Sequence, residues 1–92
     1  MNFEPTKKPK QKTDYRLETL DDEILLYHPS ETKIMYLNPT ASIIWGLCDG
    51  GRTAQEIILL LQDAYPESAS EIASDVEITL DQFIEHGCIE FD

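Results

Sequence analysis

Few side chains in this sequence have the type and spacing that catalysis or metal binding requires. His28 and His86 lack the H-E-x-x-H or H-x-x-E-H companions of a zinc site, and the chain has no P-loop, G-x-G-x-x-G or G-x-S-x-G motif. Cys48 and Cys88 have no C-x-x-C partner, which favours reduced core thiols in a cytoplasmic protein over a disulfide scaffold. We therefore predict no catalytic residue, no metal site and no cofactor.

Asp49, Gly50, Gly51 and Arg52 form a compact polar cluster. A glycine pair beside charged residues can build a phosphate-binding loop. Helix termination explains these glycines fully, because glycine adopts the left-handed conformation that closes helices. We expect Asp49 and Arg52 to pair across this turn as a structural contact.

The charge of the chain is strongly negative and unevenly distributed. Net charge is −11, yet the first 14 residues carry +2, so residues 15–92 carry −13. Such a body repels phosphate backbones, whose binding depends on lysine and arginine. The sequence also has no apolar run of about 20 residues and no signal-peptide core at its start. These features argue against a nucleic-acid or membrane partner.

The elements that must position any site begin with strands. Residues 1–14 are rich in lysine and poor in apolar residues, which predicts a disordered tail before one domain over residues 15–92. Alternating or apolar runs at 15–20, 23–28 and 32–37 predict strands, and their short connections predict an antiparallel meander. Three strands alone are barely stable, so helices should cover one face.

Helices follow at about 39–48, 54–65 and from Ser68 or Ser70 to His86, with a short strand at 88–91. Asn38 is a predicted N-cap, and Thr53 with Glu56 spells a capping box. The second helix is apolar nearly all round and is expected to be the most buried. The predicted core stripes are Ala41, Ile44, Trp45 and Cys48; Ile57, Ile58, Leu60, Leu61, Ala64 and Tyr65; and Ile72, Ala73, Val76, Leu80, Phe83 and Ile84.

This order predicts an α+β fold, winged-helix-like, in which a three-stranded antiparallel β-meander precedes three helices. Ile78 falls outside the core stripe of the third helix and is either an isolated exposed side chain or a contact for a partner. A chain without reactive groups and with free sheet edges suits a binding module. The economical mode is β-augmentation, in which an extended peptide adds a strand to a sheet edge.

Several segments together resemble the PqqD family, small proteins of pyrroloquinoline quinone biosynthesis, and related precursor-peptide recognition elements. The similarity runs from about Leu17 to Phe91. The matching segments are Tyr36-Leu37-Asn38-Pro39-Thr40-Ala41, Ile44-Trp45, Leu47-Cys48-Asp49-Gly50, Arg52-Thr53, Glu56-Ile57, Tyr65-Pro66, Asp75-Val76 and Gly87.

The resemblance implies a non-catalytic adaptor that binds the leader segment of a ribosomally made precursor peptide. It further implies that the adaptor presents the leader to a modifying enzyme, a radical S-adenosylmethionine enzyme in the namesake case. The leader would lie along the third strand and against the third helix. The implied peptide-binding residues are Thr32, Lys33, Ile34, Met35 and Tyr36 on the strand and Asp75, Ile78, Thr79 and Gln82 on the helix. We expect residues 37–53 to fix the first helix without touching the peptide.

Three alternatives remain at this point. Leader-binding modules of lasso-peptide and other modified-peptide pathways share the fold. A winged-helix DNA-binding regulator is disfavoured, because residues 70–86 contain no lysine or arginine. A purely structural subunit of a larger enzyme is the third. The free sheet edge also allows either a monomer or an edge-paired or swapped dimer.

Overall fold

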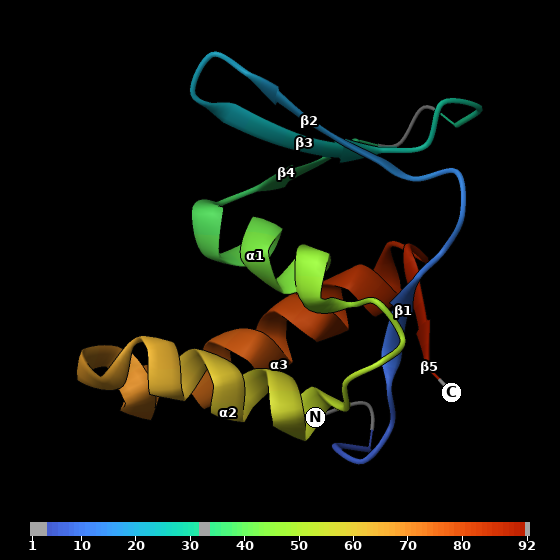
Figure 1. Ribbon diagram of the computed structural model, residues 1–92. Helices are drawn as coiled ribbons and strands as arrows, with labels where there is room; N and C mark the ends of the chain where they lie inside the picture. The colour runs from blue at the N-terminus through green and yellow to red at the C-terminus, as the bar shows by residue number, and fades with distance from the viewer. Residues whose placement is uncertain (1–3, 32–33, 92) are drawn as a thin grey trace.

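The computed structural model describes residues 4–31 and 34–91. In chain order, its elements are β1 (Pro9–Gln11), β2 (Arg16–Leu20), β3 (Glu23–Tyr27), β4 (Ile34–Leu37), α1 (Pro39–Leu47), α2 (Ala54–Ala64), the 3-10 turn η1 (Pro66–Ser68), α3 (Ala69–Glu85) and β5 (Ile89–Phe91). The sheet of β2, β3 and β4 lies on one side of the molecule and the helices lie on the other (Figure 1). This arrangement confirms the predicted α+β fold.

β3 is the central strand of the antiparallel sheet, and β2 and β4 are its two edges. Opposite faces of a strand alternate residue by residue. Leu26, which pairs with Met35, is buried, as is Leu37, so this face packs on the helices. Leu25 pairs with Tyr36 on the other face, where Tyr36 is 67% exposed.

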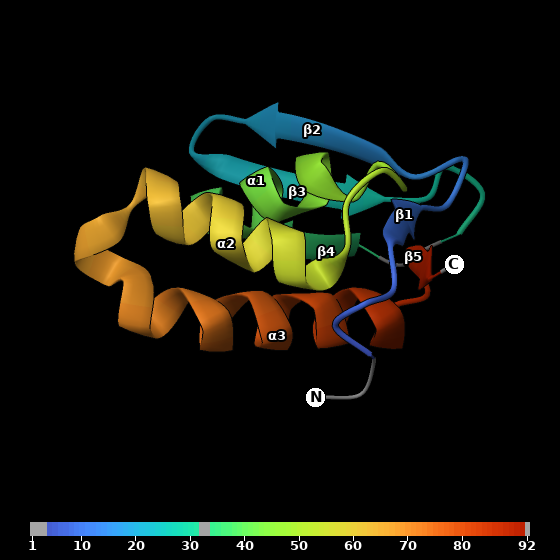
Figure 2. The same cartoon turned by 60° about the horizontal axis from the view of Figure 1, so that its bottom comes forward.

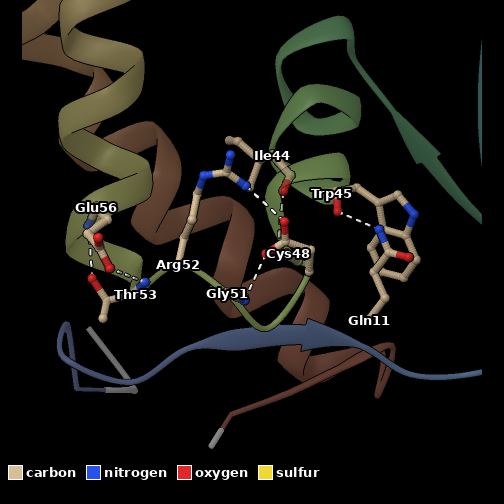
Figure 3. Close-up of polar contacts among 9 residues, drawn as sticks. Gln11, Ile44, Trp45, Cys48, Gly51, Arg52, Thr53 and Glu56 are labelled. Atoms are coloured by element: carbon tan, nitrogen blue, oxygen red, sulfur yellow. Dashed lines mark hydrogen bonds and ion pairs between the residues drawn. The ribbon is translucent and has the colours of Figure 1, made fainter.

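The predicted caps fix where α1 and α2 begin. The Asn38 side chain accepts a 2.7 Å hydrogen bond from the Ala41 N–H. At α2, Thr53 Oγ1 accepts from the Glu56 N–H at 3.0 Å while Glu56 Oε1 accepts from the Thr53 N–H at 2.9 Å, which completes the capping box (Figure 3). The Asn38 cap therefore sets the junction of β4 with α1, and the capping box sets the end of the short turn between α1 and α2.

α3 begins after η1 and closes at Gly87. Gly87 has φ +70°, and the N–H groups of Gly87 and Cys88 donate to the carbonyls of Ile84 and Phe83. This pattern is a Schellman motif, which requires a left-handed residue at that position. None of the helices in residues 4–31 and 34–91 combines the length and apolar composition needed to cross a membrane.

The central helix is α3 and not α2, which corrects the expectation from the sequence. α3 contacts α1, α2 and β5, and its Val76, Leu80 and Phe83 are fully buried. In α2, by contrast, Leu59 and Leu60 are 53% and 43% exposed, and Tyr65 just after it is 52% exposed. A helix packed along one side buries only one stripe, whatever the composition of its outer side.

Residues 4–14 are folded onto the domain, unlike the predicted tail. β1 pairs antiparallel with β5 (Figure 2). Pro9 of β1 is fully buried. Gln11 donates from its side chain to the Trp45 carbonyl at 2.8 Å. The Lys7 and Pro5 carbonyls also accept, at 3.0 Å, from the first two N–H groups of α2. Backbone hydrogen bonds hold this segment, and composition does not reveal them.

Candidate functional site

β4 has one edge paired with β3 and its other edge unpaired within the described residues. Ile34 and Tyr36 point to the outer face of the sheet, 53% and 67% exposed. Met35 faces inward and lines a small cavity with Leu26 and His86, the residue that caps α3. The other two implied strand residues, Thr32 and Lys33, lie outside the described residues.

The four implied helix residues lie together around one hollow between α3 and the end of β4. We call it the strand-side hollow, and its volume is about 220 Å³. Ile78 is 53% exposed, which confirms its place outside the core, whereas Thr79 is 9% exposed at the base. The lining residues are Asn38, Thr40, Asp75, Ile78, Thr79 and Gln82.

Asn38 and Thr40 line this hollow although the sequence suggested only a role in starting α1. Asn38 directly follows β4, and its side chain is committed to the helix cap. The available signal was the place of Asn38 in the sequence. A residue that directly follows an edge strand lies at the end of the free edge of that strand. The strand end and the helix start are thus part of one surface with α3.

The exposed side of α3 is acidic. Glu71, Asp75, Ile78, Gln82 and Glu85 recur at helical spacing, so they share one side of the helix. No lysine or arginine occurs within α3. The side chains beside the β4 edge therefore offer negative charge around one exposed isoleucine.

The two cysteines are buried thiols of the core. The Cys48 thiol donates to the Ile44 carbonyl at 3.2 Å, and the Cys88 thiol donates to the Phe83 carbonyl at 3.3 Å. Burial raises the pKa of Cys48 to about 12 and that of Cys88 to about 11. A nucleophilic cysteine needs the opposite shift.

Raising the pH above about 9 should therefore lower the free energy of unfolding. The folded chain keeps thiol protons up to about pH 12 at Cys48, whereas the unfolded chain releases them near the ordinary pKa of 9.0. The stability that the protonated Cys48 thiol contributes is complete below the pKa of the unfolded chain. It is lost as the pH rises toward the pKa of the folded chain. Urea unfolding of the wild type and Cys48→Ala from about pH 7.5 to 10.5 checks this. The stability difference between them should shrink by up to about 1.4 kcal/mol per pH unit above pH 9; a constant difference contradicts it.

The polar cluster after α1 is structural, as expected. Arg52 pairs with Asp49 at 2.9 Å, and the Gly51 N–H donates to Asp49 at 2.8 Å (Figure 3). The Gly51 hydrogen bond, followed by the Arg52 charge, lowers the pKa of Asp49. Among residues 4–31 and 34–91, no three histidine, cysteine or carboxylate side chains are grouped to hold a metal ion.

Comparison with known proteins gives a family. The family model of Coenzyme PQQ synthesis protein D (PqqD) matches residues 23–89, from the start of β3 to the start of β5. A PqqA binding protein of Pseudomonas putida (strain W619) is 34% identical over 88 residues, which cover 92% of this chain and 88% of that protein. No solved structure matches the chain. The chain therefore belongs to the PqqD family.

Proposed function

We propose that this protein binds the leader segment of a ribosomally synthesised precursor peptide as an added strand on β4 and presents it to the enzyme that modifies the precursor. The relative from Pseudomonas putida is by its name a protein that binds PqqA. Resemblance to the PqqD family supports a radical S-adenosylmethionine enzyme as the modifying partner. The protein contributes binding, and the partner carries out the chemistry.

The observation that carries this proposal is the edge of β4 that no described residue pairs with, beside the strand-side hollow. An edge strand offers a row of N–H and C=O groups that an extended chain can pair with. These main-chain bonds supply affinity, and pockets for side chains supply specificity. Asp75, Ile78, Thr79 and Gln82 would form such a pocket, while Ile34, Met35 and Tyr36 supply the backbone edge.

Single proline substitutions at Met35 and Tyr36 test strand addition. Alternate residues of an antiparallel edge strand direct their N–H groups inward or outward, so these neighbours have opposite roles. The variant that loses an outward N–H should keep its fold and bind the peptide about thirtyfold more weakly (about 2 kcal/mol), because proline removes the donor and its ring obstructs the incoming strand. The other variant should lose stability. Calorimetric titration with the synthetic leader encoded beside this gene, together with thermal unfolding, measures both effects.

The second edge of the sheet provides the control. Leu17→Pro and Glu18→Pro place the same pair of changes in β2, which is also an edge strand. Whichever of these two β2 variants keeps its fold should bind the leader with the affinity of the wild type. Strand addition at β4 is excluded if the β4 variant that keeps its fold also keeps full affinity for the leader.

A further inference from the structure

A second hollow lies between the helices, on the side of α3 near its beginning. Its volume is about 300 Å³, near the lower end of what ligand pockets occupy. We call it the helical hollow. Figure 2 shows α2 and α3 side by side, joined at the end where α3 begins. Its apolar lining includes Ile43 of α1, Leu61 of α2 and Ile72 of α3.

The helical hollow adjoins the strand-side hollow. Both are lined by Thr40 and Asp75, one from each wall. Together they follow α3 from Gln82 back to Glu71, a rise of about 16 Å along the helix axis at about 1.5 Å per residue. An extended peptide covers that distance with about five residues. A peptide paired with β4 therefore reaches the helical hollow by continuing past Leu37.

The chemistry of the helical hollow defines its occupant. Ile43 is 42% exposed and Tyr65 is 52% exposed, so apolar surface is open to a ligand side chain. Glu71 and Asp75 are the charged residues of the lining, and both are acidic. Complementary charge steers a partner and fixes its register. The fitting segment has an apolar side chain with a lysine or arginine close to it.

We propose that the helical hollow anchors the part of the bound peptide that continues beyond the added strand, by one apolar side chain flanked by a basic residue. This inference rests on the proposed peptide binding and names the peptide class that the site selects. Strand addition alone is tolerant of sequence, because it uses the backbone. The anchor would set the register of the peptide along β4.

Ile43→Ala tests the anchor, and Leu60→Ala is its matched control. The two residues are 42% and 43% exposed. Ile43 lines the helical hollow, whereas Leu60 lies with Leu59 and Asp63 on a side of α2 that does not line it. Ile43→Ala should weaken binding of the synthetic leader encoded beside this gene about five- to tenfold, and Leu60→Ala should leave it unchanged. A leader shortened to its strand-forming residues should bind wild type and Ile43→Ala equally. Equal binding of the full leader by both proteins overturns the anchor.

The acidic rim is tested with Glu71→Gln against Glu77→Gln. Both changes remove one charge from α3, but only Glu71 lines the hollow. Glu71→Gln should weaken leader binding about threefold at low salt and flatten its salt dependence, whereas Glu77→Gln should do neither. The same loss in both variants would mean that net charge, and not this rim, attracts the peptide.

NMR of the wild type separates failure of the anchor from failure of peptide binding itself. With the leader added, the β4 amides and the Ile43 methyl groups should both shift. Shifts in β4 without a shift at Ile43 overturn the anchor and leave strand addition standing. Shifts in neither overturn the proposed peptide binding, and the anchor with it.

Discussion

Deletion of residues 1–12 should lower the free energy of unfolding by about 3–5 kcal/mol. The deletion removes β1, whose ladder pairs with β5, and the Pro9 carbonyl that accepts from Gly50 at 3.0 Å. It also leaves the N–H groups of Ala54 and Gln55 without their carbonyl partners. Each such hydrogen bond contributes about 1 kcal/mol net, and buried Pro9 adds apolar area. The total free energy of unfolding of a domain is only about 5–15 kcal/mol, so this loss would be a large share of it. Urea unfolding followed by circular dichroism measures the loss.

A charge control separates the backbone of this segment from its lysines. Changing Lys7, Lys8, Lys10 and Lys12 to glutamine keeps every backbone hydrogen bond while removing the positive charge of the segment. The variant should stay within about 1 kcal/mol of the wild type, since exposed charges contribute little. An unchanged urea midpoint in the deletion variant would contradict a stabilising role for β1.

Phe83→Ala should be the most damaging single substitution, at about 4 kcal/mol. Phe83 is 0% exposed near the C-terminal end of α3, and its ring packs edge-on against Trp45 at 5.5 Å between centroids. Truncating a buried phenylalanine costs about 3–5 kcal/mol, part of which is the lost aromatic pair. The melting temperature should fall by more than about 15 °C, because 1 kcal/mol shifts it by about 4–8 °C in a domain of this size.

Ile78→Ala is the control on the same helix. Ile78 is 53% exposed, so its truncation should change the melting temperature by only about 2–3 °C. Phe83→Ala and Ile78→Ala therefore separate the core side of α3 from its exposed side. Similar melting temperatures for the two variants would contradict the central position of α3 in the core.

Local signals made most of the fold predictable. Asn38, Thr53 and Glu56 act within three or four residues of themselves, so the sequence shows where α1 and α2 begin. The β2–β3 turn is equally local, since Asp21 adopts φ 54° between the two strands. Such contacts need no knowledge of the rest of the chain.

The parts that could not be predicted depend on residues far apart in the sequence. Gln11 bonds to Trp45, and β1 pairs with β5, so the order of the N-terminal segment exists only in the folded chain. Leu59 and Leu60 look like core residues but face away from α3, because α2 is packed along one side.

The candidate site shows the same division. Family resemblance indicated the α3 residues, and helical periodicity shows that Asp75, Ile78 and Gln82 share a side. That Asn38 and Thr40 complete the hollow depends on how α1 packs against α3, which only the tertiary structure gives.

Hydrogen exchange in the two edge strands tests the central claim most directly. β4 and β2 are the edges of one sheet and serve as test and control within one molecule. With saturating leader peptide, outward amides of β4 should exchange at least about tenfold more slowly, because each gains a hydrogen bond, while those of β2 should exchange as before. Protection of β2 in place of β4, or of neither while the peptide is bound, would contradict strand addition at β4.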